Sequence, residues 1–140
     1  MRRSHTRSIS IDVPPQVVLG LVADPAELPR WAPAFARAAR PAGGDHWLID
    51  TGHREVTVRV RVSPELGTVD FLMADALPGL EVGVFARVLR NGCGTEFVFT
   101  RFFPDAMSEI EVAEQKAVVA VELQTVRALC ESAAAGAAAA

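Results

Sequence analysis

The sequence of 140 residues contains no tyrosine, two cysteines and a single lysine among its 14 basic residues. The missing tyrosine removes one common phenolic acid from any mechanism. Cys93 and Cys130 stand alone and lack the spacing of metal ligands, so we expect free thiols and no metal site. Neither His46 nor His53 belongs to a pattern typical of a catalytic triad or a metal centre.

Long apolar runs are missing as well. No run approaches the roughly 18 to 20 apolar residues of a membrane helix. Residues 1–7 contain no apolar stretch of the kind found in a signal peptide, so we expect a cytoplasmic protein without a membrane span. The formal net charge of −3 provides no electrostatic footprint for nucleic acid. The sequence has no glycine-rich phosphate loop, and we expect no cofactor.

The composition is that of an ordinary globular protein. Half of the residues are hydrophobic and 22% are charged, which argues against disorder. The length suits one domain with one hydrophobic core. We expect that domain to span residues 1–132. An alanine-rich tail should follow over residues 133–140 and either fray or weakly extend the last helix.

Prolines, glycines and changes of hydrophobic period divide the chain into elements. Alternation over 8–13 predicts a strand, and Pro15 and Asp24 mark the starts of two short helices at 17–23 and 26–36. Residues 35–39 are expected to extend into a further strand. Ser108 and Glu111 form a capping-box pattern that opens a long helix over 108–131. Five strand candidates with short connections, which favour an antiparallel meander, lie between these regions: 47–51, 53–62, 68–73, 81–90 and 95–103.

This order of elements predicts an α+β fold. A curved antiparallel sheet of about six or seven strands would wrap around the last helix, which alone is long enough to cross it. A sheet that grips a helix leaves space between the two layers. We therefore expect an internal cavity whose mouth is covered by the two short helices.

Two segments carry a resemblance to a known superfamily. The opening SISIDVPPQVVLGLVADPAELPRW resembles that of START-like, helix-grip proteins, the SRPBCC superfamily of polyketide cyclases/dehydrases and lipid-transfer proteins. Residues 67–112 and the helix end VELQTVRALCE resemble small bacterial members. The resemblance covers about residues 6–131 and implies the helix-grip fold with a hydrophobic cavity. Cyclases, carriers, co-chaperones and stress proteins share that fold, so the resemblance does not select one activity.

Two arginines occur on strand faces that otherwise look interior. Arg54 shares its face with Val56, Val58 and Val60, and Arg101 shares its face with phenylalanines at 97, 99 and 103. A buried guanidinium needs a partner. Each arginine therefore either reaches water at a strand end, pairs with an acid or contacts a ligand. The candidate acids are Asp50, Asp70 and Glu114.

The last helix has two apolar stripes. One contains Val112, Val119, Leu123, Val126 and Cys130, and the resemblance suggests that this stripe faces the sheet. The other contains Met107, Ile110, Ala117, Val118, Val121 and Ala128, with Glu114 near its centre. If the second stripe faces the cavity instead, Glu114 becomes an interior carboxylate with a raised pKa. The alternative is an exposed glutamate beside Lys116.

Aromatic and aliphatic side chains would line the cavity. The resemblance places Trp31 and Phe35 near the mouth, where they either contact a ligand or simply pack on the sheet. The further candidates for ligand contact are Trp47, Val56, Val58, Val60, Phe85, Phe97 and Phe99. One departure from aromatase/cyclases concerns the strand before Ser63-Pro64. Such enzymes tend to place hydroxyl and arginine side chains there, whereas this chain has Val58 and Val60.

Three functional hypotheses follow. The cavity binds a hydrophobic small molecule that is polyketide-like, aromatic or lipid. A cofactor-free cyclase/dehydratase would use Arg54 or Arg101 to polarise a carbonyl and Asp70 or Glu114 to exchange protons. The third hypothesis is a protein-interaction module, monomeric or homodimeric, that uses Val112, Val119 and Leu123 of the last helix.

Overall fold

A computed structural model describes residues 1–73 and 83–139 of the chain. Its seven strands form one antiparallel sheet in the order β1-β7-β6-β5-β4-β3-β2. The strands are β1 (Ser4–Ile11), β2 (Ala38–Pro41), β3 (His46–Asp50), β4 (Glu55–Ser63), β5 (Thr68–Met73), β6 (Gly83–Asn91) and β7 (Gly94–Phe102). The helices are α1 (Pro15–Val22), a 3-10 turn η1 (Pro25–Glu27), α2 (Leu28–Trp31) and α3 (Glu109–Ala139).

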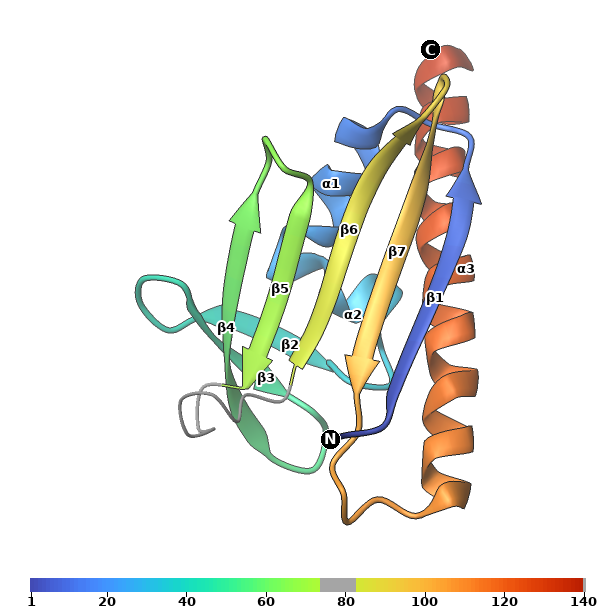
Figure 1. Cartoon of the computed structure of the whole chain (residues 1–140). Helices are drawn as coiled ribbons and strands as arrows, with labels where there is room; N and C mark the ends of the chain where they lie inside the picture. The colour runs from blue at the N-terminus through green and yellow to red at the C-terminus, as the bar shows by residue number, and fades with distance from the viewer. Residues whose placement is uncertain (74–82, 140) are drawn as a thin grey trace.

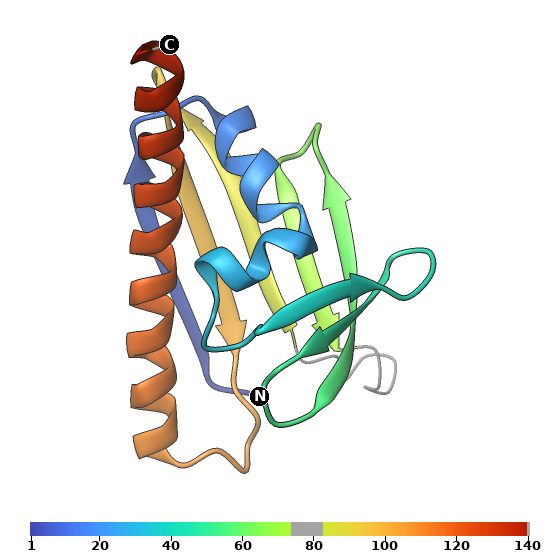
Figure 2. The same ribbon diagram turned by 180° about the vertical axis from the view of Figure 1, so that it is seen from behind.

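The helices lie on one face of a curled sheet. In Figure 1, α3 runs along the β1 edge, while α1 and α2 lie behind the strands. Figure 2 shows the reverse side, where α1 and α2 cover β5 to β7, and β2 and β3 curl toward the same face. The α+β helix-grip fold expected from the sequence is confirmed.

Local sequence explains most of the element boundaries. Asp24 accepts a hydrogen bond from the Ala26 amide at 3.0 Å, which begins η1. Ser108 and Glu111 exchange the two hydrogen bonds of a capping box at the start of α3, so this part of the prediction is confirmed. Gly67 has φ +69°, and a Cβ there would lie 2.4 Å from the Val88 carbonyl oxygen. The β4–β5 turn therefore requires glycine.

Three predicted boundaries differ from the structure by four or more residues. The first strand begins at Ser4, four residues before the alternation becomes regular, because it pairs with β7 as far as Phe102. The helix expected over 26–36 ends at Trp31, since Ala32 precedes Pro33 and leaves the helical region. α3 continues to Ala139, because alanine has the highest helix propensity. The predicted turn at Leu77-Pro78-Gly79 and the start of a strand at Glu81 lie outside the described residues.

The core lies between the inner face of the sheet and the helices. Inward side chains of β4 include Val56, Val58 and Val60, and α3 contributes Val119 and other residues that are almost fully buried. The Leu123 stripe of α3 therefore faces the sheet, as the resemblance suggested. All members of this stripe are buried in the protein's own core, so they do not form an external dimer surface. They are Val112, Val119, Leu123, Val126 and Cys130.

The opposite side of α3 faces water. Ile110 is 74% exposed and Val121 is 61% exposed. Within the described chain, α3 and the shorter helices are not apolar enough over a sufficient length to cross a bilayer.

Candidate functional site

A pocket of about 310 Å³ opens between the sheet, α2 and α3. Its volume is at the lower end of the range of small-molecule sites, roughly 300 to 1,000 Å³. The mouth region contributes Leu28, Trp31, Ala32, Ala34 and Phe35, and the sheet contributes Val58, Phe71, Met73, Val84 and Phe99. Val118 comes from α3. The walls are therefore largely hydrocarbon and aromatic, as suits an apolar ligand.

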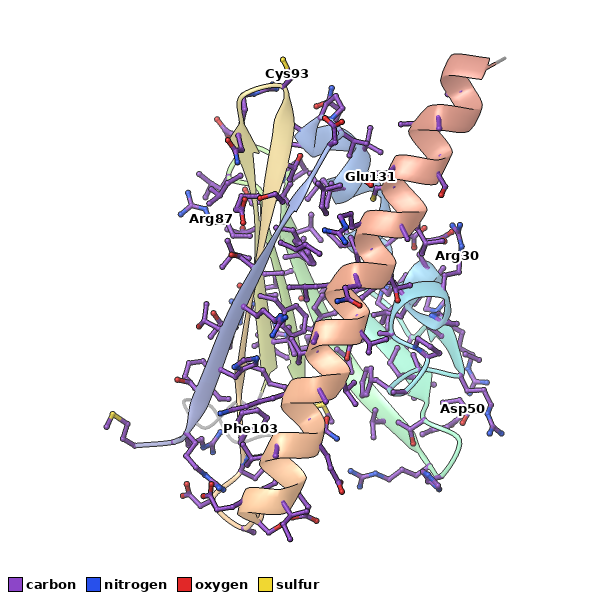
Figure 3. All side chains as sticks on the ribbon, turned by 90° about the vertical axis from the view of Figure 1, so that its right-hand side faces the viewer. Arg30, Asp50, Arg87, Cys93, Phe103 and Glu131 are labelled. Carbon is purple, nitrogen blue, oxygen red and sulfur yellow. The ribbon has the colours of Figure 1, made fainter. Side chains whose placement is uncertain are left out.

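Polar side chains meet at the β7–α3 side of this pocket. Among the described lining residues they are Arg101, Gln115 and Glu122. The Arg101 Nη1 atom donates a hydrogen bond of 2.6 Å to Gln115 Oε1. The guanidinium carbon also lies 5.6 Å from the centroid of the Phe103 ring. Phe103 is labelled in Figure 3, which shows side chains filling the space between α3 and the sheet.

Burial acts against the charge of Arg101. Desolvation lowers the pKa of its guanidinium, and the nearby Glu122 partly opposes that change. A guanidinium nevertheless stays protonated in proteins because its pKa starts so high. Arg101 is thus a fixed positive charge in the pocket wall. After the bond to Gln115, four of its five N–H donors have no hydrogen bond to another described residue.

Glu122 is the acid of the pocket. Its side chain belongs to a residue that is 8% exposed, and burial raises its pKa to about 7, while the Arg101 charge acts in the opposite direction. In residues 1–73 and 83–139, no hydrogen bond or ion pair within 4.0 Å reaches its carboxyl group. Arg101 and Glu122 therefore both line the pocket, but they do not form an ion pair with each other within the described chain.

A histidine lies beside this group on the next strand. His5 of β1 is directly opposite Arg101 of β7, so the two side chains share one face of the sheet. The His5 Nε2 atom is buried and has no hydrogen-bond partner in the described part of the chain. Burial, followed by the charges of Lys116 and Arg7, lowers the pKa of His5. His5 is therefore mainly neutral at pH 7.

The structure brings together part of the predicted site. Trp31, Phe35, Val58, Phe99 and Arg101 all line the pocket. The T-shaped contact of Trp31 with Phe71, at 6.3 Å between ring centroids, holds the indole against the sheet.

Other predicted residues lie in the core away from the described pocket lining. Val56, Val60 and Phe97 are buried, and Trp47 is partly buried against the same core. They support the sheet that forms the wall.

Four predicted residues lie elsewhere. Arg54 is exposed in the turn before β4, where its carbonyl oxygen accepts from the Thr51 amide at 2.9 Å. Asp70 points to the outer face, because its neighbours Val69 and Phe71 are buried inward. Phe85 is opposite Asp70 and packs on Phe102 on that outer face, at 5.9 Å. Glu114 is exposed on α3.

Glu122 and Gln115 were missed by the sequence interpretation. The interior glutamate with a raised pKa is Glu122, whereas Glu114 is exposed. Gln115 and Glu122 are seven residues apart, which places them two helical turns apart on one line of α3. Val119 and Val126 lie three or four residues from Glu122, so the buried stripe passes beside both polar residues. The three- and four-residue spacing from the buried valines was the sequence signal that could have identified Glu122 as an interior residue.

Comparisons with known proteins agree with this architecture. The model of a family described as polyketide cyclase/dehydrase and lipid transport matches residues 2–131. The aromatase/cyclase ZhuI of a Streptomyces species is similar in structure, with a TM-score of 0.71, 15% identity and 94% of each chain covered. The Aha1 dimer from Colwellia psychrerythraea has a TM-score of 0.70 and 16% identity, covering 89% of this chain and 93% of that one.

A protein of uncharacterised function from Bacillus thuringiensis is also similar, with a TM-score of 0.72 and 16% identity. The match covers 91% of this chain and 98% of that one. At such low identities these structures support the fold and not a shared activity. No curated protein matches the sequence.

Proposed function

The chain belongs to the polyketide cyclase/dehydrase and lipid transport family, and from that premise we propose that its pocket binds a hydrophobic small molecule with one oxygen-bearing end. The observation that carries the proposal is the division of the pocket into apolar walls and one polar side. Trp31, Phe35 and Phe99 provide the apolar contact, while Arg101 and Glu122 face the same space from β7 and α3.

The energetics favour such an amphiphilic ligand. Each apolar Å² that a ligand buries contributes about 25 cal/mol to binding. A purely apolar ligand would, however, cover Arg101 and Glu122 without replacing their hydrogen bonds to water. An unpaired buried polar group costs about 1–3 kcal/mol. A ligand oxygen placed at the β7–α3 side removes this penalty and fixes the orientation of the molecule.

The proposal is tested by filling the pocket. Val118→Phe adds a ring to a residue that lines the pocket. Val121→Phe makes the same change three residues later, at a position that is 61% exposed. Native mass spectrometry of both variants and of the unchanged protein, after purification and after incubation with fatty acids and aromatic polyketides, measures ligand uptake. We expect uptake by the unchanged protein and by Val121→Phe, and its loss in Val118→Phe.

Two results would count against the proposal. Equal uptake by Val118→Phe and Val121→Phe would place binding outside this pocket. Absence of any bound molecule in the unchanged protein, both as purified and after incubation with the panel, would remove the binding function.

A specific observation favours a second candidate function, cofactor-free proton transfer. A carboxyl group with a pKa of about 7 accepts and returns protons near neutral pH. In a dehydration, the Glu122 carboxylate would remove a proton from the carbon next to a ketone, and Arg101 would stabilise the enolate oxygen. The enolate electrons then form the C=C bond as the β-hydroxyl leaves as water with the proton from Glu122.

This candidate has its own experiment. The dehydration of a β-hydroxy ketone is followed by absorbance for the unchanged protein, Glu122→Gln and Glu114→Gln. Catalysis by Glu122 predicts a loss of about 10²–10⁴-fold for Glu122→Gln. The exposed Glu114→Gln variant should keep the full rate. Equal rates in all three proteins would eliminate Glu122 as the proton-transfer group.

A further inference from the structure

Among the described residues, the polar side of the pocket presents one fixed cation, Arg101, and one carboxyl group without a hydrogen-bond or ion-pair partner, Glu122. The Arg101 guanidinium donates one side-chain hydrogen bond within the described chain, from Nη1 to Gln115 Oε1 at 2.6 Å. Glu122 shares the pocket wall with it, yet the two groups do not form an ion pair within 4.0 Å among the residues that the structure describes. Both groups therefore have hydrogen-bonding capacity left for a third group between them.

The charge balance at this place selects the third group. Arg101 is positive at every physiological pH. A neutral Glu122 leaves one uncompensated positive charge in a pocket whose other walls are apolar, and such a charge is costly unless an anion faces it. A carboxylate supplies the missing negative charge, and it has two oxygens with which to contact two groups at once.

We propose that the ligand is a hydrophobic monocarboxylic acid whose carboxylate binds between Arg101 and Glu122, accepting from the guanidinium with one oxygen and from the protonated Glu122 with the other. This inference rests on the proposed binding function and names its ligand class. Two carboxyl groups that share one proton beside a cation form a stable arrangement, whereas two adjacent ionised carboxylates repel each other. The acid's apolar body then lies along Trp31, Phe35 and Phe99.

A neutral oxygen fits this wall less well. A ketone, ester or alcohol accepts from Arg101, but it leaves the positive charge uncompensated. A neutral oxygen already receives a charge-assisted hydrogen bond from Arg101, so the carboxylate gains by its additional attraction to the positive charge, which is stronger in a partly buried site than in water. We therefore expect an acid to bind about tenfold more tightly than its carboxamide, which has nearly the same shape but no charge.

The arrangement also makes acid binding dependent on pH. Glu122 must carry a proton in the complex, and its pKa of about 7 in the empty protein means that it loses this proton above neutral pH. The titratable side chains that face α3 from the elements packed against it are His5 and Arg7 on β1, Arg30 on α2 and Arg101 on β7, with Arg3 directly before β1. Of these, Arg101 is the charge that acts on Glu122. Arg30 is paired with Glu27 at 2.6 Å, and Arg3 is paired with Glu109 at 2.8 Å.

The test uses two matched pairs of probes: decanoic acid with decanamide, and naphthoic acid with naphthamide. Calorimetry of the full chain at pH 6 and pH 8.5 measures the Kd of each probe. Titrations at pH 8.5 in two buffers of different ionisation enthalpy also measure proton uptake. We expect at least one acid to bind about tenfold better than its amide at pH 6. Its affinity should fall at least tenfold at pH 8.5, with the uptake of nearly one proton.

Two substitutions assign these effects to residues. Glu122→Gln provides a permanent N–H donor, so it should bind the acid equally at both pH values and better than the unchanged protein at pH 8.5. Arg101→Gln should lose the preference for acid over amide. Glu114→Gln and Arg54→Gln are the exposed controls and should behave like the unchanged protein. If Arg101→Gln does not fold by circular dichroism, the Glu122→Gln result decides alone.

Each contrary outcome has a definite meaning. Equal affinity for acid and amide, or tighter binding of the amide, overturns the carboxylic acid inference and leaves the binding function intact. A pH dependence that persists in Glu122→Gln also overturns it, because the proton would belong to another group such as His5. If none of the four probes binds, the inference fails, while the uptake experiment with Val118→Phe decides the binding function separately.

Discussion

The Arg101 guanidinium and the Gln115 side-chain amide meet across the boundary between β7 and α3, with 2.6 Å between Nη1 and Oε1. This contact holds the partly buried guanidinium on Gln115, and no ion pair with Glu122 forms among the described residues. It also ties the helix to the sheet at the pocket wall. One hydrogen bond therefore contributes both to the stability of the fold and to the position of the charge that a ligand meets.

Removing the acceptor should weaken the fold. Gln115→Leu leaves the partly buried Arg101 without its described partner, and a buried unpaired donor costs about 1–3 kcal/mol. We expect the free energy of unfolding, measured with urea, to fall by about that amount. Gln124→Leu is the matched control because Gln124 is exposed on the same helix. Equal losses in the two variants would show that the contact with Arg101 does not stabilise the protein.

Glu122 should make the protein less stable as the pH rises through neutrality. Its pKa is about 7 when folded and near 4.5 when unfolded, so the folded state binds the proton more tightly between these values. Stability is fully present below about pH 4.5 and falls until the pH exceeds about 7, by roughly 3 kcal/mol in total. Urea titrations at several pH values, compared with Glu122→Gln, measure this contribution as the difference between the two curves.

The control for the pH effect is Glu114→Gln, which should follow the unchanged protein because Glu114 is exposed. A constant difference between the unchanged protein and Glu122→Gln from pH 5 to pH 8.5 would contradict a raised pKa for Glu122. The same two variants therefore separate a buried acid from an exposed one on a single helix.

The fold could be predicted from the sequence because its signals are local. Alternation marked β4 and β5, and the Ser108–Glu111 capping box marked the start of α3. The short hairpin connections then left an antiparallel order as the simple solution. The tail was less predictable, since alanines extend a helix by propensity alone and bury little.

The site was predicted only in part, because two strand faces look alike in sequence. The alternation of residues placed Arg54 on the same strand face as Val56. In the structure Arg54 belongs to the turn at residues 51–54, before β4 begins, and its side chain is exposed. The alternation of residues along β6 could not show that Phe85 packs against Phe102 on the outer face of the sheet. On α3, the apolar stripes made Glu114 a candidate if its stripe faced the cavity, whereas Gln115 and Glu122 lie at the edge of the buried stripe. Which polar residues enter a cavity depends on the rotation of the helix against the sheet, and a helical pattern determines that rotation only within a wide arc.

The capping box should contribute measurably to α3. The Glu111 amide donates to Ser108 Oγ at 3.1 Å, and the Ser108 amide donates to Glu111 Oε2 at 2.7 Å. The hydrogen bond from the Ser108 amide lowers the pKa of the Glu111 carboxyl group, and the Ser108 side chain lowers it further. Ser108→Ala should reduce the free energy of unfolding by about 1 kcal/mol. Ser132→Ala, at an exposed position inside the same helix, should not destabilise the protein. A larger loss for Ser132→Ala would contradict the capping role.

The two faces of the sheet should respond differently to one and the same substitution. Phe99 lines the pocket from β7, whereas Phe85 packs against Phe102 on the outer face. Phe99→Leu removes aromatic contact with a bound molecule and should weaken its binding by about 1 kcal/mol, or roughly fivefold in Kd. Phe85→Leu should leave Kd unchanged, although it also removes a ring contact. Fluorescence titration of a ligand that the unchanged protein binds compares the two variants directly. If Phe85→Leu weakened binding as much as Phe99→Leu, the ligand would have to contact the outer face, and the pocket beneath α2 would no longer account for binding.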